Sequence, residues 1–187
     1  MTALPDLNIL LAGFGGQGIL FAGKIIAYAG LLGGREVSWL PSYGPEMRGG
    51  TANCTVVLSD ETIGSPLVNS LDALVVMNRP SYDKFIDQVK PDGVVVLDSS
   101  LISGYSPRAD VRYYPLPATL LAEENELQSL GNVIMVGQLL AATGFSDEAT
   151  LNRAIEKSVS AKHADLTAAN KRALHLGAIW AAEQGQG

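Results

Sequence analysis

The sequence is poor in several features that would point to particular functions. Only one of its 187 residues is a cysteine, Cys54, so the chain by itself can form neither an internal disulfide nor the cysteine ligand set of an iron–sulfur cluster. The formal charge is −6 and no cluster of lysine and arginine is present, which argues against binding to nucleic acid. No apolar run is long enough to span a membrane, and the first residues lack the features of a signal peptide. We therefore expect a cytoplasmic protein that binds neither nucleic acid nor membrane.

The overall composition predicts one globular domain. Hydrophobic residues make up 47% of the sequence and charged residues 17%, proportions that are ordinary for a globular protein. A chain of this length buries roughly 70% of the surface that it exposes when unfolded. Neither an internal repeat nor a low-complexity linker interrupts it, so we expect residues 1–187 to form a single domain.

A glycine-rich turn near the start organises the rest of the prediction. Residues 7–12 are typical of a buried strand, and residues 19–32 carry apolar and small residues at helical spacing. A strand, a glycine turn and a helix form the first half of a βαβ unit. Glycines bring backbone N–H groups close to a ligand at the helix N-terminus, where an anion is stabilised. The candidate cofactor-binding residues of this turn are Gly13, Gly15, Gly16, Gln17 and Gly18.

The residues of the turn leave three interpretations open. Its G-x-G-x-x-G spacing occurs in dinucleotide-binding folds, but such sites need an acidic residue at the end of the second strand. The expected second strand, residues 36–40, has Glu36 at its start and ends in Trp39-Leu40. A phosphate-bearing ligand or a partner chain is thus favoured over a nicotinamide cofactor. The structural alternative is a turn that only packs the helix on the sheet.

The loop after the second expected strand carries the candidate catalytic residues. Residues 41–50 contain two prolines and three glycines, which argues against regular secondary structure. In a doubly wound fold this loop follows the carboxyl end of a strand beside the glycine turn, where ligands bind. Tyr43, Glu46 and Arg48 are therefore candidate catalytic residues. The alternative is a surface loop in which Glu46 and Arg48 only pair with each other.

A second strand–helix–strand unit is predicted further along the chain. Residues 72–78 and 94–98 have the apolar centres of strands that are buried on both faces of a parallel sheet. The helix between them is expected to begin at Pro80, to reach Val89 and to be stopped by Pro91-Asp92-Gly93.

The carboxyl ends of these strands should lie on the same rim as the glycine turn. Asn78 and Ser99 stand there and are further candidate cofactor-binding residues. The sequence thus predicts an α/β fold of Rossmann-like type, with a mostly parallel sheet and helices on both faces.

The remaining segments predict a weaker strand and a helical C-terminal region. Residues 111–114 read as an edge strand, and helical patterns cover residues 117–127, residues 132–143, a segment capped by Ser146, and the chain from residue 165. Cys54 lies within an expected strand and is interpreted as a small buried apolar residue rather than a nucleophile.

The glycine turn and the following loop together resemble those of a known family. Residues 13–18 and the run Tyr43-Gly44-Pro45-Glu46-Met47-Arg48-Gly49-Gly50 are similar to the gamma subunit, or gamma domain, of thiamine-diphosphate-dependent 2-oxoacid:ferredoxin oxidoreductases. The glycine turn alone is a weak signal, but its combination with this loop is specific. The resemblance covers nearly the whole chain and also includes residues 56–59, 65–66, 94–99 and 132–137.

The resemblance implies a gamma subunit that completes an enzyme and holds no cofactor or metal by itself. Such enzymes oxidatively decarboxylate a 2-oxoacid, reduce ferredoxin and transfer the acyl group to coenzyme A. Alpha, beta and delta chains would carry thiamine diphosphate, magnesium and the iron–sulfur clusters, and ferredoxin would be an indirect partner. Coenzyme A would be a shared ligand near the glycine turn. The family's Gly-Asp-Gly has only Pro91-Asp92-Gly93 as a counterpart here.

Several functional expectations follow from this resemblance. We favour 2-oxoglutarate as the oxoacid, and we expect the isolated chain to be inactive and able to form a dimer. Two alternatives belong to other classes of protein. One is a stand-alone nucleotide-binding oxidoreductase, and the other is a non-catalytic assembly module of the complex.

Overall fold

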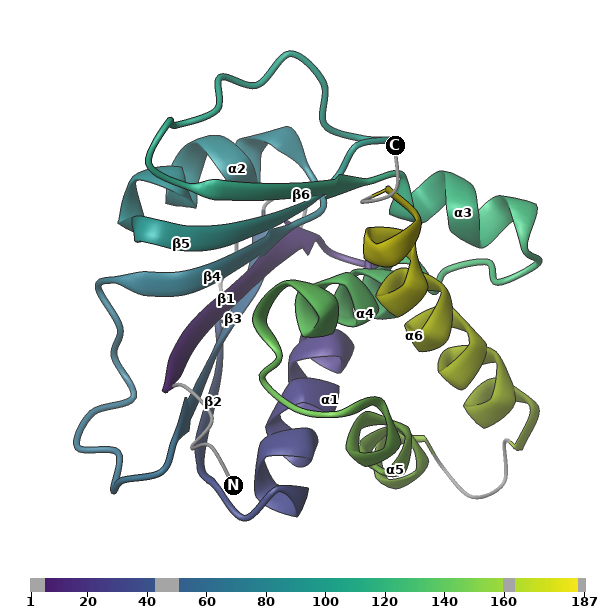
Figure 1. Ribbon diagram of the computed structural model, residues 1–187, viewed down its shortest axis with the longest axis horizontal. Coiled ribbons are helices and arrows are strands. Elements are labelled where there is room, and N and C mark those ends of the chain that lie inside the picture. Colours follow the sequence, from purple (N-terminus) through teal and green to yellow (C-terminus); the bar gives the residue numbers. More distant parts are fainter. Residues whose placement is uncertain (1–5, 43–50, 160–163, 185–187) are drawn as a thin grey trace.

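A six-stranded sheet runs through the computed structural model of the chain, which describes residues 6–42, 51–159 and 164–184 (Figure 1). The strand order is β2-β3-β1-β4-β5-β6. Strands β1, β4, β5 and β6 pair in parallel, whereas β3 is antiparallel to both of its neighbours, β1 and β2. The predicted mostly parallel α/β fold is confirmed. The strands are β1 (Leu7–Phe14), β2 (Glu36–Ser42), β3 (Thr51–Ser59), β4 (Leu71–Val76), β5 (Val89–Asp98) and β6 (Arg112–Leu116).

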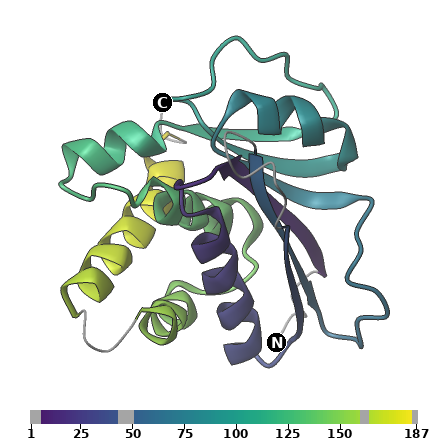
Figure 2. The same cartoon turned by 180° about the vertical axis from the view of Figure 1, so that it is seen from behind.

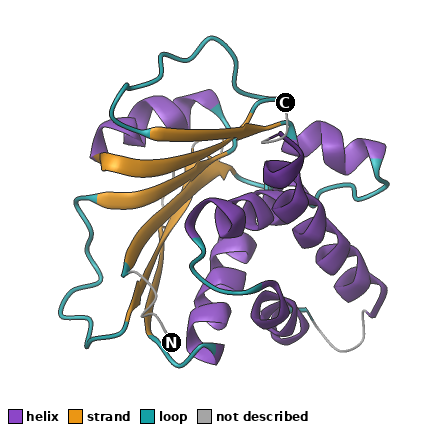
Figure 3. Cartoon of the chain, in the orientation of Figure 1, coloured by secondary structure: helices purple, strands orange, loops and turns teal. Residues whose placement is uncertain are grey.

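Helices cover the two faces of the sheet unequally (Figures 2 and 3). The helices α1, α4, α5 and α6 lie on one face, and α2 lies on the other. None of the described helices is both long enough and apolar enough to cross a membrane. The helices are α1 (Ile19–Leu32), α2 (Arg79–Phe85) with the short 3-10 helix η2 (Ile86–Gln88), α3 (Ala118–Glu124), α4 (Gly131–Thr143), α5 (Glu148–Ser158) and α6 (Ala164–Gln184).

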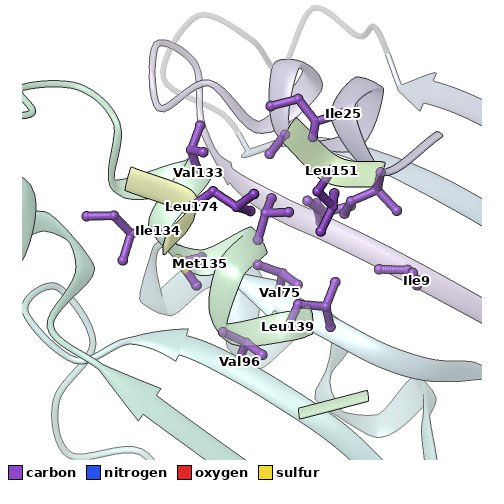
Figure 4. Packing of buried hydrophobic residues seen from close by; sticks show 14 of the residues in the cluster. Ile9, Ile25, Val75, Val96, Val133, Ile134, Met135, Leu139, Leu151 and Leu174 are labelled. Atoms are coloured by element: carbon purple, nitrogen blue, oxygen red, sulfur yellow. The ribbon is translucent and has the colours of Figure 1, made fainter. Parts of the chain in front are cut away.

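Two apolar cores result from the alternation of side chains along the strands. Ile9, Val75 and Val96 point toward α1 and α4 and belong to the larger core, which Figure 4 shows from close by. The intervening residues of the same strands, such as Leu74 and Val95, belong to the smaller core under α2. Strands buried on both faces explain the unbroken apolar runs of the sequence.

Helix α4 is the centre of the larger core. All nine residues from Gly131 to Leu139 are buried, because the sheet covers one side of the helix and α6 covers the other. The two helices touch at glycines: a Cβ atom built on Gly177 would overlap the carbonyl oxygen of Ile134, and one built on Gly137 would overlap that of Leu174. The backbones therefore pack against each other with no side chain between them.

Helix α2 and the segment after it differ from the prediction. The helix ends at Phe85 and η2 at Gln88, and Pro91-Asp92-Gly93 lies inside β5 instead of stopping a helix. The pairing with β4 jumps from Leu71–Val89 to Ala73–Val94, and Asp92 has a φ of 61°. These residues form a bulge-like irregularity inside the strand. The prediction that they end a helix is therefore wrong.

Two smaller expectations have different outcomes. The N-cap of α5 is Asp147 and not Ser146: the Asp147 side chain accepts a hydrogen bond from the Thr150 backbone N–H at 2.8 Å, which holds the pKa of this carboxyl below its usual range. The interpretation of Cys54 as a buried apolar residue is confirmed. Its side chain is fully buried, and burial raises the pKa of the thiol to about 12.

The contact between α4 and α6 can be tested with Gly177→Ala. The added methyl group meets backbone atoms that cannot rotate away, so we expect the free energy of unfolding in urea to fall by at least about 2 kcal/mol. Gly64→Ala is the matched control, because a Cβ atom there has no neighbour within 4 Å. Equal stability of the two variants would contradict the close helix contact.

Candidate functional site

Four strands bring their carboxyl ends to one edge of the sheet. The parallel strands β1, β4, β5 and β6 end at Phe14, Val76, Asp98 and Leu116. The glycine turn follows the first of them and leads into α1. The predicted rim is thus present, and it is the edge at which α/β folds bind ligands.

Gln17 holds the glycine turn in its shape. Its backbone N–H donates to the Phe14 carbonyl oxygen at 3.2 Å, and its side-chain oxygen accepts a hydrogen bond from the Phe14 backbone N–H at 2.6 Å. Its side-chain amide donates to the Met77 carbonyl oxygen at 3.0 Å. A Cβ atom on Gly13 would lie 2.7 Å from the Gln17 side-chain oxygen. The motif therefore uses one glycine to make room for Gln17, which ties the turn to the end of β4.

Asn132 links the turn to α4. Its side-chain amide donates to the Gly18 carbonyl oxygen at 2.9 Å. Gly18 has a φ of 73°, and a Cβ atom there would overlap the Asn132 amide nitrogen. Asn132 is 4% exposed, and its side-chain oxygen has no hydrogen-bond partner. A buried acceptor without a partner is uncommon.

A cavity of about 440 Å³ lies against the turn. Five chain segments form its wall, and most of the side chains are neutral, with Glu123 as the one acidic group. The lining residues are Gly16, Gln17, Met77, Leu101, Thr119, Ala122, Glu123, Gln128, Ser129, Gly131 and Asn132.

Two helices begin at this cavity with their first N–H groups uncapped. Neither α1 nor α4 has a side-chain N-cap hydrogen bond or an acidic residue in its first turn. The first N–H groups of a helix have no partner within the helix, and the end carries a partial positive charge. Gly16 on α1's side and Gly131 on α4's side line the cavity. This arrangement favours an anionic group.

Asp98 supports the wall of the cavity, and both of its carboxylate oxygens accept hydrogen bonds from the protein. It is fully buried at the end of β5. One carboxylate oxygen accepts a hydrogen bond from the Ser100 backbone N–H at 3.0 Å. The other accepts from the Thr119 backbone N–H at 3.1 Å and from the Thr119 hydroxyl at 2.6 Å. Asp98 thereby fixes the start of α3 beside the cavity.

The predicted cofactor-binding residues fall into two groups. Gly16 and Gln17 line the cavity, and Gly13 and Gly18 shape the turn behind them. Gly15 is exposed. Asn78 and Ser99 lie on the rim as expected but do not line the cavity: the Asn78 side-chain oxygen caps α2 by accepting from the Ser81 N–H, and the exposed Ser99 donates its N–H to the Leu116 carbonyl oxygen.

The candidate catalytic residues Tyr43, Glu46 and Arg48 lie outside the described residues. The ends of their loop are placed, however. Thr51 pairs with Phe14 and Ser42 with Asn53, which in turn pairs with Ala12. The loop therefore starts and ends at the edge of the sheet that carries the glycine turn.

Sequence reasoning missed five polar residues of the site: Thr119, Glu123, Gln128, Ser129 and Asn132. Asn132 had a usable signal, because it is a lone amide at the start of a strongly apolar helix. Within residues 6–42, 51–159 and 164–184, no group of three or more histidine, cysteine, aspartate or glutamate side chains could hold a metal ion.

Comparison with known proteins gives a consistent result. A model of the family described as pyruvate ferredoxin/flavodoxin oxidoreductase matches residues 8–180. Ketoisovalerate oxidoreductase subunit VorA of Methanothermobacter thermautotrophicus is 40% identical over 98% of this chain, and 2-oxoglutarate synthase subunit KorC of Methanocaldococcus jannaschii is 42% identical over 81%. The chain spans 38% of the length of the first and 83% of the second.

Solved structures of two related proteins have the same fold as this chain. The gamma subunit of a keto/oxoacid ferredoxin oxidoreductase from Geobacter sulfurreducens superposes with a TM-score of 0.79 at 27% identity, covering 92% of this chain and 96% of that one. A 2-oxoglutarate:ferredoxin oxidoreductase from Magnetococcus marinus, with 2-oxoglutarate, coenzyme A and succinyl-CoA bound, gives a TM-score of 0.81 at 28% identity, covering 94% and 31%. The resemblance seen in the sequence is confirmed.

The role of Gln17 can be tested with Gln17→Glu. A carboxylate has no donor for the Met77 carbonyl oxygen and is repelled by it, so we expect the free energy of unfolding in urea to fall by about 1–3 kcal/mol. Gln128→Glu adds the same charge at an exposed position on the same cavity and should be nearly neutral. If both variants unfold at the same urea concentration, Gln17 does not hold the turn.

Proposed function

Because this chain belongs to the pyruvate ferredoxin/flavodoxin oxidoreductase family, we propose that it acts as a gamma-type subunit of a 2-oxoacid:ferredoxin oxidoreductase. The family match over residues 8–180 supports this proposal, as do relatives that are named as subunits of such enzymes. The relatives named for ketoisovalerate and for 2-oxoglutarate are about equally similar, so the proposal specifies a 2-oxoacid as a class. The activity is the oxidative decarboxylation of that acid to an acyl-CoA, with reduction of ferredoxin.

The observation that supports a binding role for this chain is that two helix N-termini without side-chain caps meet at one cavity. Coenzyme A has several phosphate groups, and the structural relative from Magnetococcus marinus is a complex with that cofactor. The chain's residues are suited to a phosphate: no side chain caps the N–H groups at the start of α1, and a side chain at Gly16 would meet nothing within 4 Å. Backbone can therefore approach an anion closely there.

We assign the binding of coenzyme A to this cavity, with separate roles for its residues. The N–H groups at the start of α1 and α4 would hold a phosphate, and the unpartnered Asn132 side-chain oxygen together with Thr119 and Ser129 would orient the polar groups of the ligand. Bound coenzyme A supplies the thiol that accepts the acyl group. In this proposal Gly13, Gly15, Gly16, Gln17 and Gly18 present or shape the binding backbone, and Asn78 and Ser99 support the rim.

The remaining chemistry is assigned to companion chains. With one cysteine in the sequence and no metal-binding group among the described residues, thiamine diphosphate, magnesium and iron–sulfur clusters would be held by alpha, beta and delta chains, in the cytoplasm. Tyr43, Glu46 and Arg48 would line the interface with those chains. The isolated subunit should therefore be inactive.

A stand-alone dinucleotide-binding enzyme is less consistent with the topology. In a Rossmann fold the ribose is held from the end of the strand next to β1. Here the antiparallel β3 occupies that place, and β2 lies one strand further away. An acidic residue at the end of β2 would be displaced from the turn, and that strand ends in Ser42.

The phosphate site can be tested with Gly16→Asp in the reconstituted complex. A carboxylate at the start of α1 would occupy the N–H groups and repel a phosphate, so we expect the KM for coenzyme A to rise at least about 10-fold. Gly34→Asp is the matched control, since Gly34 also has a positive φ, has open space around it, and lies beyond the other end of α1. An unchanged KM in Gly16→Asp would overturn the assignment of the cavity.

The proposed interface role of the loop can be tested with Arg48→Ala. A guanidinium can bind a phosphate or carboxylate through two hydrogen bonds, which alanine cannot replace. We expect either a higher KM for coenzyme A or weaker assembly of the complex, measured by steady-state kinetics and by co-purification. Normal co-purification of the complex together with a normal KM for coenzyme A would contradict the role.

A further inference from the structure

Strand β2 leaves an apolar surface at one edge of the sheet. Trp39 and Leu40 are adjacent on this strand and point to opposite faces, with exposed fractions of 37% and 42%. Leu31, at the end of α1, is 57% exposed and lines a groove together with Trp39, on the face of the sheet opposite to Leu40. We call Leu31, Val37, Trp39 and Leu40 the β2 edge patch. Such a concentration of exposed large apolar side chains is a feature of interaction sites.

A groove forms part of the β2 edge patch. It has a volume of about 260 Å³, lies between α1 and β2, and is lined mainly by apolar side chains, with Lys24 as its charged group. Beside it, the outer edge of β2 has no neighbouring strand among the described residues. The backbone N–H and C=O groups of such an edge strand are available to a second polypeptide.

The indole ring of Trp39 packs against α1 at Gly23. A Cβ atom on Gly23 of α1 would overlap the buried Cys54 Sγ and lie 3.1 Å from the Trp39 Nε1. Glycine at this position therefore lets the indole and the thiol pack on the helix backbone. Tryptophan is enriched among the residues that dominate binding energy, and Trp39 is 37% exposed next to an apolar groove.

The opposite edge of the sheet shows that this exposure is not general. Both edge strands carry one charged residue and one proline, which disfavour pairing with another strand: Arg112 and Pro115 in β6, and Glu36 and Pro41 in β2. In β6, Tyr113 stacks on Tyr105 and is hydrogen-bonded to Tyr82. Among the described residues, β2 contributes Trp39 and Leu40 to the exposed large apolar side chains and β6 contributes none, so β2 is the edge with the larger uncovered apolar surface.

The lengths of the relatives suggest which polypeptide binds the β2 edge patch. The same domain makes up 83% of the Methanocaldococcus KorC relative but only 38% of the Methanothermobacter VorA relative and 31% of the Magnetococcus chain. It occurs both as most of a chain and joined to a much longer polypeptide. A joined segment is held at a high effective concentration next to the domain, so that even a weak contact between the two is occupied.

We infer that the β2 edge patch binds the companion polypeptide that corresponds to the rest of the longer relatives, through an apolar segment that fills the groove and lies along β2. The inference rests on the proposed function, because it takes this chain to be one subunit of the same kind of complex. The groove receives an aliphatic or aromatic side chain against Trp39, while the cavity at the glycine turn stays open for its ligand.

The test measures binding of the companion, produced as a separate chain, to Trp180→Phe, which leaves Trp39 as the sole tryptophan of the chain. We expect the Trp39 emission to shift to shorter wavelength and to saturate as the companion is added. Leu31→Lys and Leu40→Lys should each raise the Kd at least about 30-fold, as expected for a central interface residue. The matched controls Leu166→Lys and Leu67→Lys, at positions 52% and 74% exposed, should change it less than about 3-fold.

The outcomes separate this inference from the proposed function. Failure of the unsubstituted chain to bind the companion would overturn both. Normal binding with equal Kd values for the edge and control variants would overturn the inference alone. A stable dimer of the chain that Leu31→Lys dissociates, measured by sedimentation, would show that a second copy covers the patch and would also overturn it.

Discussion

The close contact of α4 with α6 is the constraint on which the rest of the structure depends. The first nine residues of α4 are all buried and mostly apolar, so the helix must be covered on both the sheet side and the outer side. Gly137 and Gly177 allow α6 to approach to backbone contact. With its position set in this way, α4 begins at the carboxyl edge of the sheet. The packing of the core and the place of the ligand cavity therefore have one common cause.

The arrangement separates residues that build the site from groups that stay free in it. Gln17, Asp98 and the amide nitrogen of Asn132 all have partners and hold the turn, the start of α3 and the junction of two helices. No side chain caps the N–H groups at the starts of α1 and α4, and the Asn132 side-chain oxygen has no hydrogen-bond partner. A site of this kind can bind and orient a ligand, but it has few groups able to move protons or electrons. This division agrees with the role of a subunit.

Prediction succeeded where one local pattern decided the outcome. Buried strands and the apolar helix of residues 132–143 were recognised from hydrophobic periodicity, and the edge position of residues 111–114 was confirmed. It failed where two local signals competed. Pro91-Asp92-Gly93 has the residues of a turn, but the pairing of Val89 and Val94 with β4 on either side of it keeps it inside a strand. Ser146 and Asp147 are both good N-caps, and the carboxylate of Asp147 reaches the Thr150 N–H.

The sequence by itself determined the class of fold, the glycine turn and the family, because these depend on short-range periodicity and on contiguous motifs. Only the tertiary structure decided which residues meet at the cavity. The Asn132 amide lies 114 positions from Gly18 along the chain and contacts its carbonyl oxygen, and Thr119 reaches Asp98 from another element. The insertion of β3 between β1 and β2 was likewise decided by tertiary structure. These contacts and the strand order depend on how separate elements pack, and no local sequence pattern predicts them.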